Sequence, residues 1–71
     1  MNKKEILNDI QSMYEALEKA YDMAGGLRDS FTGVNPEGNE YQLKQHCNII
    51  RGKIYELREL KGHFVNEVKA I

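Results

Sequence analysis

Apolar residues recur along the first half of the chain in alternating steps of four and three, the period of an amphipathic helix. The row passes through the double glycine Gly25-Gly26 without losing phase, and no alternation of period two, as a strand would show, persists here. Asn2 is placed to cap this helix, with Glu5 three residues later as in a capping box. We predict a helix over about 3–31. The row comprises Ile6, Ile10, Met13, Leu17, Ala20, Ala24, Leu27 and Phe31.

A second row with the same spacing fills the other half of the chain. The segment Asn35-Pro36-Glu37 before it favours a helix start, with an N-cap, a proline at the first helical position and an acid in the first turn. We predict a second helix over about 36–70, in which Lys61 is the polar exception to the row. The row comprises Leu43, Cys47, Ile50, Ile54, Leu57, Lys61, Phe64, Val68 and Ile71.

The connection between the two helices is short. Gly33 suits the position just after the end of the first helix, which leaves a turn over about 32–35. A connection of this length joins antiparallel neighbours. We therefore predict an all-α fold, an antiparallel two-helix hairpin that forms a single domain over 1–71. The alternative is a break at Gly25-Gly26 that gives a short third helix over 27–31.

A hairpin of this kind leaves apolar side chains without cover. A 71-residue chain buries little surface alone, and its single cysteine, Cys47, cannot form an internal disulfide. Assembly of hairpins into a helical-bundle oligomer would supply the missing burial. We therefore expect the chain to bind itself, as a homodimer or a higher oligomer. The apolar side chains that lie outside the two rows and would be left without cover include Leu7, Met23, Ile49, Leu60 and Val65.

Charge and composition exclude several classes of partner. The chain has ten Lys and Arg residues and eleven Asp and Glu residues. It therefore lacks the excess of basic residues that is typical of a nucleic-acid-binding protein. No apolar run is long enough to cross a membrane, and the chain starts without the apolar core of a signal peptide. We expect no nucleic-acid partner and no membrane, and the lone cysteine favours a cytoplasmic location.

The sequence contains no recognisable catalytic or metal-binding arrangement. His46 and His63 have no carboxylate and nucleophile at a spacing that would build a triad, and Cys47 occupies an apolar position of its helix. The glycines of Gly25-Gly26 follow no strand, so they do not form a phosphate-binding loop. We predict no enzyme, no cofactor and no metal.

Cations and tyrosines recur together on the second helix. Lys44, Arg51 and Arg58 are seven residues apart, and an aromatic or amide side chain precedes each by three residues. If the hairpin turns near residues 33–34, Tyr21 neighbours Lys44 and Tyr14 neighbours Arg51. Such a row either serves helix pairing or binds a planar anion by stacking and by bidentate hydrogen bonds. The candidate partner-binding or ligand-binding residues are Arg28, Tyr41, Lys44, Asn48, Arg51 and Tyr55.

Two functions fit this sequence. The first is a non-catalytic helical module that binds another protein as an adaptor or inhibitor. Its brevity, balanced charge and helical build are typical of phage anti-defence inhibitors and bacterial regulatory accessories. The alternative is an oligomer that sequesters a small anionic ligand such as a nucleotide between its subunits.

Overall fold

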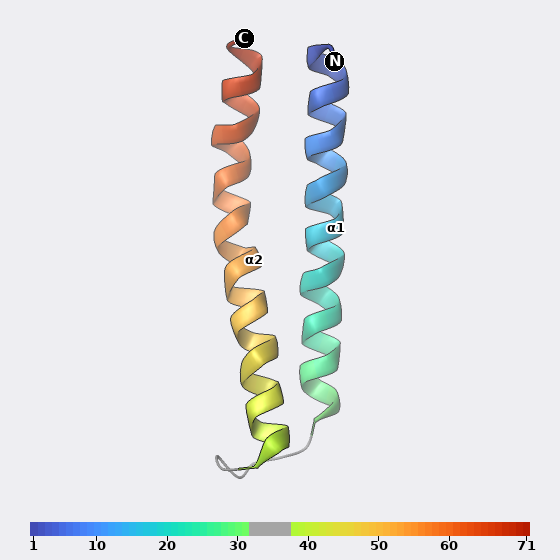
Figure 1. Cartoon of the computed structure of the whole chain (residues 1–71), viewed down its shortest axis with the longest axis vertical. Helices are drawn as coiled ribbons and strands as arrows, with labels where there is room; N and C mark the ends of the chain where they lie inside the picture. The colour runs from blue at the N-terminus through green and yellow to red at the C-terminus, as the bar shows by residue number, and fades with distance from the viewer. Residues whose placement is uncertain (32–37) are drawn as a thin grey trace.

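The protein is an antiparallel hairpin of two long helices. The structure, a computed structural model, describes residues 1–31 and 38–71 and contains α1 (Lys3–Ser30) and α2 (Asn39–Lys69). The helices lie side by side over their length, and the two termini meet at one end of the molecule (Figure 1). The described residues include no strand. The predicted all-α hairpin is confirmed.

Helix α1 begins as the sequence predicts. The Asn2 side-chain Oδ1 accepts a hydrogen bond of 2.8 Å from the Glu5 backbone N–H, and Asn2 Nδ2 donates to Glu5 Oε1 at 3.3 Å. The helix then continues without interruption through Gly25 and Gly26 to Ser30, and Phe31 is its C-cap. The double glycine therefore lies inside one helix, with no separate short helix after it.

Helix α2 begins at Asn39, with Gly38 in an extended conformation as its N-cap. This start is later than the one near residue 36 that the sequence favours. The roles predicted for Gly33, Asn35, Pro36 and Glu37, and the turn over 32–35, lie outside the described residues.

The contact between the helices uses only half of each predicted apolar row. The remaining places are taken by the side chains one position further along the chain, which are tyrosines and cations, with Leu7 and Val65 at the terminal end. The buried apolar residues among those described are Ile10, Tyr14, Ala24, Cys47, Ile54 and Val68. The buried and half-buried contact row is Leu7, Ile10, Tyr14, Leu17, Tyr21, Ala24 and Arg28 in α1, with Lys44, Cys47, Arg51, Ile54, Arg58, Lys61, Val65 and Val68 in α2.

The register of the helices differs from the expected one by about one heptad. Tyr14 donates its hydroxyl to the Leu57 carbonyl oxygen at 2.8 Å, and Tyr21 contacts Arg51. The predicted pairs of Tyr21 with Lys44 and of Tyr14 with Arg51 are therefore wrong. The start of α2 at Asn39, about three residues later than predicted, moves the residues of that helix toward the loop end of α1 and accounts for part of this difference.

The resulting molecule is narrow and has a small core. Its backbone extends over 51 × 16 × 13 Å and forms a single layer of two helices. Each helix can bury a stripe against its neighbour, but two broad sides of the hairpin remain open. These two sides are chemically different.

Candidate interaction surfaces

The first side of the hairpin carries cations and tyrosines and is called the polar side below. Its members alternate between the helices and contact one another across the groove. They are Tyr14, Glu18, Tyr21, Arg28, Asn48, Arg51, Arg58 and Lys61.

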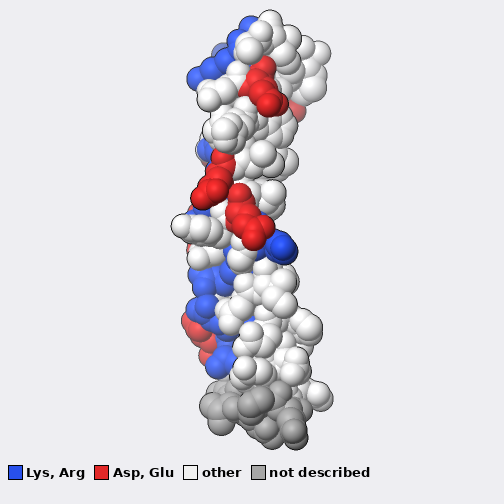
Figure 2. All heavy atoms as spheres, turned by 90° about the vertical axis from the view of Figure 1, so that its left-hand side faces the viewer, with Lys and Arg blue, Asp and Glu red and all other residues white. Residues whose placement is uncertain are grey.

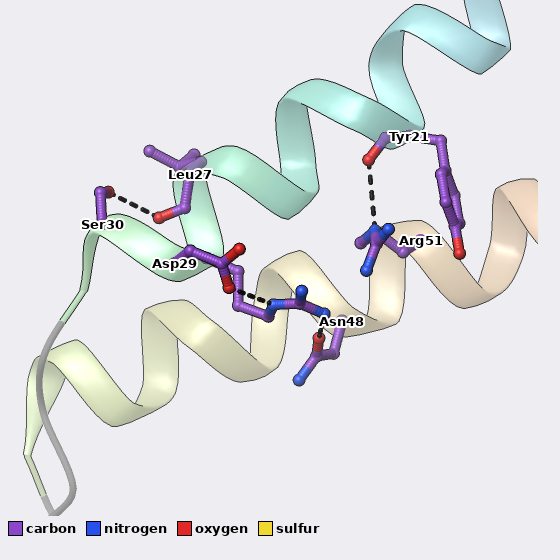
Figure 3. A network of polar contacts seen from close by, with 7 residues as sticks. Tyr21, Leu27, Asp29, Ser30, Asn48 and Arg51 are labelled. Carbon is purple, nitrogen blue, oxygen red and sulfur yellow. Dashed lines mark hydrogen bonds and ion pairs between the residues drawn. The ribbon is translucent and has the colours of Figure 1, made fainter.

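Tyr21 is the centre of the polar side. The Arg51 guanidinium carbon lies 4.0 Å from the centroid of the Tyr21 ring, and Arg51 Nε donates to the Tyr21 carbonyl oxygen at 3.2 Å (Figure 3). The Arg58 guanidinium carbon lies 4.5 Å from the same centroid. Both distances fall in the range in which a cation is attracted to an aromatic ring. Two cations of α2 thus hold one tyrosine of α1.

Arg58 also pairs with a carboxylate of α1. Its Nε lies 2.8 Å from Glu18 Oε1, and its Nη2 donates to Glu18 Oε2 at 3.1 Å. The Nε contact is an ion pair without hydrogen-bond alignment, so the hydrogen bond runs through Nη2. Because Glu18 is more than half exposed, this pair stabilises the hairpin only modestly.

The polar side continues at each end. Toward the loop, Arg28 donates to Asn48 Oδ1 at 3.2 Å and to Asp29 Oδ1 at 3.1 Å (Figure 3). Toward the termini, Lys61 donates to Gln11 Oε1 at 2.8 Å and lies 5.6 Å from the Tyr14 ring. Lys61 is therefore a helix-pairing residue, which explains the polar exception in its row.

The structure brings some of the predicted site residues together. Arg28 and Asn48 are hydrogen-bonded to each other, and Arg51 packs on Tyr21. Tyr41 and Lys44 are half-buried, whereas Tyr55 is 58% exposed with its ring 5.8 Å from the Arg58 guanidinium. Whether any of these residues binds a ligand stays a prediction.

One residue of this cluster was not identified from the sequence. Gly25 is buried, and a Cβ atom placed on it would lie 3.2 Å from Arg51 Cζ. The guanidinium therefore lies in tight contact with the position that the Cβ of any other residue would take. The sequence signal was available, because Gly25 follows Tyr21 by one helical turn.

The second side of the hairpin consists of most of the other half of the two predicted rows, together with Met23 from outside them, and is called the apolar side below. Figure 2 shows a related asymmetry: charged side chains concentrate along one edge and the middle of that view, and the opposite edge is largely uncharged. The apolar side comprises Ile6, Met13, Ala20, Met23, Leu27, Leu43, Ile50, Leu57 and Phe64.

Many of these side chains are open to solvent. Met23 is 73% exposed, Leu27 is 55% exposed and Ile50 is 51% exposed. These residues line a wide hollow of about 560 Å³ near the loop end, together with the small residues Ala20, Ala24 and Gly26. The apolar side is therefore a contiguous surface, and large exposed surfaces of this kind mark sites of interaction.

Bulky side chains occupy the other end of the apolar side. Ile6 and Met13 of α1 lie there with Phe64 of α2, around a smaller hollow of about 220 Å³. Asp9 and Met1 complete its rim. The apolar side thus has a smaller hollow near the termini and a wider one near the loop, where small residues lie among Met23, Leu27 and Ile50.

Other kinds of site have little support. Among residues 1–31 and 38–71, no three His, Cys, Asp or Glu side chains are grouped so that they could hold a metal ion. No helix in this described part is long and apolar enough to cross a membrane. Cys47 is a free, buried thiol.

Comparisons with known proteins give no relative for this chain: no family model, no curated protein and no solved structure matches it.

Proposed function

We propose that this protein is a non-catalytic interaction module, of the adaptor or inhibitor type, that binds helical protein surfaces through its apolar side. The polar side holds the two helices together, and the apolar side contacts the partner. It names no catalytic residue, no metal and no cofactor.

The observation that carries the proposal is the contrast between the two sides. On the polar side, the charged groups have partners within the chain, as in Arg51 on Tyr21 and Arg58 on Glu18. On the apolar side, Ile50 and Met23 remain more than half exposed beside a hollow. A groove between two helices with exposed apolar residues at heptad spacing suits docking of further helices by knobs-into-holes packing.

Site-specific photo-cross-linking in cells that express this protein tests the proposal. A benzophenone amino acid replaces Ile50 on the apolar side or, as a control, Ile49, its equally apolar neighbour on the outer face of α2. We expect strong cross-links to protein from position 50 and weak ones from position 49. Equal cross-linking at the two positions, or none at position 50, would contradict the proposal.

The second candidate function is binding of a small anion on the polar side. Arg28, Arg51 and Arg58 place three guanidinium groups along one groove, and guanidinium groups pair with phosphates in a bidentate manner. A thermal-shift screen with nucleotides tests it, because a ligand that binds the folded state raises Tm by mass action. An unchanged Tm at millimolar nucleotide would exclude this candidate.

A further inference from the structure

We infer that the apolar side is covered by the apolar side of a second copy of this chain, which runs in the opposite direction, so that two hairpins form an antiparallel four-helix bundle. This inference rests on the proposed function, since it names the partner of the same surface. It places the two loops at opposite ends of the bundle.

The exposed area of the chain matches what such a dimer needs. The accessible surface is 5440 Å², whereas a compact protein of this mass exposes about 4,500 Å². The excess of about 900 Å² is close to the roughly 800 Å² that each partner buries in a standard interface. Burial of this area against one second copy would reduce the exposed area per chain to about that of a compact protein of 8.2 kDa.

The heptad pattern also points to four helices. In each helix, one half of the apolar row is used inside the hairpin, as with Ile10 and Ile54. The other half, which includes Met13 and Ile50, is exposed on the apolar side. Helices in a four-helix bundle contact two neighbours and need apolar residues at both sets of positions, whereas a lone pair needs only one.

The shape of the apolar side determines the direction of the second copy. A hollow of about 220 Å³ lies beside Met13 and Phe64 near the termini, and a wider one of about 560 Å³ lies beside Met23 and Ile50 near the loop. Opposite directions place the end with the smaller hollow of each copy over the wider hollow of the other. Parallel directions would leave the two wide hollows facing each other, and close-packed interiors do not retain voids of that size.

A twofold axis in this arrangement passes near Ala16. Asp9 and Met23, seven residues before and after Ala16, line the hollows at the two ends of the apolar side. Ala16 is therefore midway along the same edge of α1. In the opposite-direction dimer α1 packs against α1 of the second copy, and the two Ala16 residues lie close together. In a parallel dimer α1 packs against α2, and the two Ala16 residues lie across a diagonal of the bundle.

Light scattering with a matched pair of variants tests the second copy. We expect the wild-type chain at about 100 µM to have twice its monomer mass of 8.2 kDa. Ile50→Asp should reduce this mass to that of the monomer, and Ile49→Asp should leave the dimer intact, although the two isoleucines are similarly exposed. A wild-type monomer, a trimer or a tetramer would overturn the inference, whatever the variants do.

Disulfide trapping tests the direction. In a Cys47→Ala background, Ala16→Cys should form a covalent dimer under mild oxidation, since a disulfide requires Cα atoms within about 7 Å of each other. Ile49→Cys in the same background is the control and should remain monomeric under denaturing conditions. A non-covalent dimer in which residue 16 fails to cross-link would overturn the opposite-direction arrangement.

The photo-cross-linking experiment separates this inference from the proposed function. Cross-links from position 50 to this chain itself support the second copy and the use of the apolar side for recognition, and cross-links to a different protein support the adaptor or inhibitor role. Cross-links from position 50 only to a different protein, with a wild-type monomer by light scattering, overturn the second copy and leave the interaction module standing.

Discussion

Arg51 of α2 contacts two groups of Tyr21 in α1, its aromatic ring and its backbone carbonyl oxygen. The Arg51 guanidinium carbon lies 4.0 Å from the ring centroid, and Arg51 Nε donates to the backbone carbonyl oxygen of Tyr21. Buried Gly25 provides the space on α1 in which the guanidinium lies. A single arginine thus fixes the register of the hairpin, because a shift of either helix would separate it from both tyrosine groups and from the glycine.

Loss of this arginine should destabilise the fold. We expect Arg51→Gln to lower the free energy of unfolding by about 1–2 kcal/mol, because it removes a charge-assisted hydrogen bond and a cation–π contact at a half-buried position. Urea denaturation followed by circular dichroism measures the change. The control is Lys53→Gln, at an exposed position with a loose 3.9 Å ion pair to Glu56, which should change stability by less than about 0.5 kcal/mol.

An Arg51→Gln variant as stable as the parent would contradict the structural role. It would also leave the Arg51 side chain available for ligand recognition, which is the alternative that the sequence left open.

The glycines of the chain should respond differently to alanine. At Gly52 an added Cβ meets no atom within 4 Å, so Gly52→Ala should stabilise the protein by about 0.5–1 kcal/mol through helix propensity. At Gly25 the added Cβ would press on the Arg51 guanidinium, which would have to shift by a few tenths of an ångström in its contact with Tyr21. We expect Gly25→Ala to fall short of Gly52→Ala by about 1 kcal/mol or more. Equal gains at the two positions in thermal unfolding would disprove the close approach.

The hydroxyl of Tyr14 should contribute measurably to stability. Tyr14 is buried, and its hydroxyl donates to the Leu57 carbonyl oxygen at 2.8 Å. Tyr14→Phe should cost about 1 kcal/mol, because the carbonyl oxygen loses a side-chain donor in a partly buried groove. Tyr55→Phe, at a position 58% exposed, is the matched control and should be neutral. If the two variants unfold at the same urea concentration, the hydrogen bond contributes nothing.

The thiol of Cys47 reports on opening of the hairpin. Cys47 is free and buried between the helices, so a thiol reagent reaches it only when the hairpin opens. We expect Ellman's reagent to react at least about tenfold more slowly with the native chain than with the chain in urea. Native reaction as fast as denatured reaction would show that the helices are not packed as described.

The sequence predicted the helices well because their apolar period is long and regular. The row through Ile10 and Ala24 continues across Gly25-Gly26, and the structure has one helix there. The Asn2 cap was predictable for a similar reason, since capping depends on residues only three positions apart.

The orientation of each helix about its own axis was not predictable from the period alone. A tyrosine and a methionine one position apart, such as Tyr14 and Met13, lie on neighbouring faces, and either could meet the second helix. The structure selects Tyr14, because its hydroxyl reaches the α2 backbone and Lys61 covers its ring. The register was also missed, because it depends on where α2 begins, which short-range signals place only approximately.

This hairpin should acquire much of its stability from a second copy on its apolar side. The most direct test is the concentration dependence of thermal unfolding, measured by circular dichroism between about 2 µM and 200 µM chain. Because assembly stabilises the folded state by mass action, we predict that Tm rises with concentration over this range, and that Ile50→Asp abolishes the rise. A wild-type Tm that stays the same across the hundredfold range would contradict the claim.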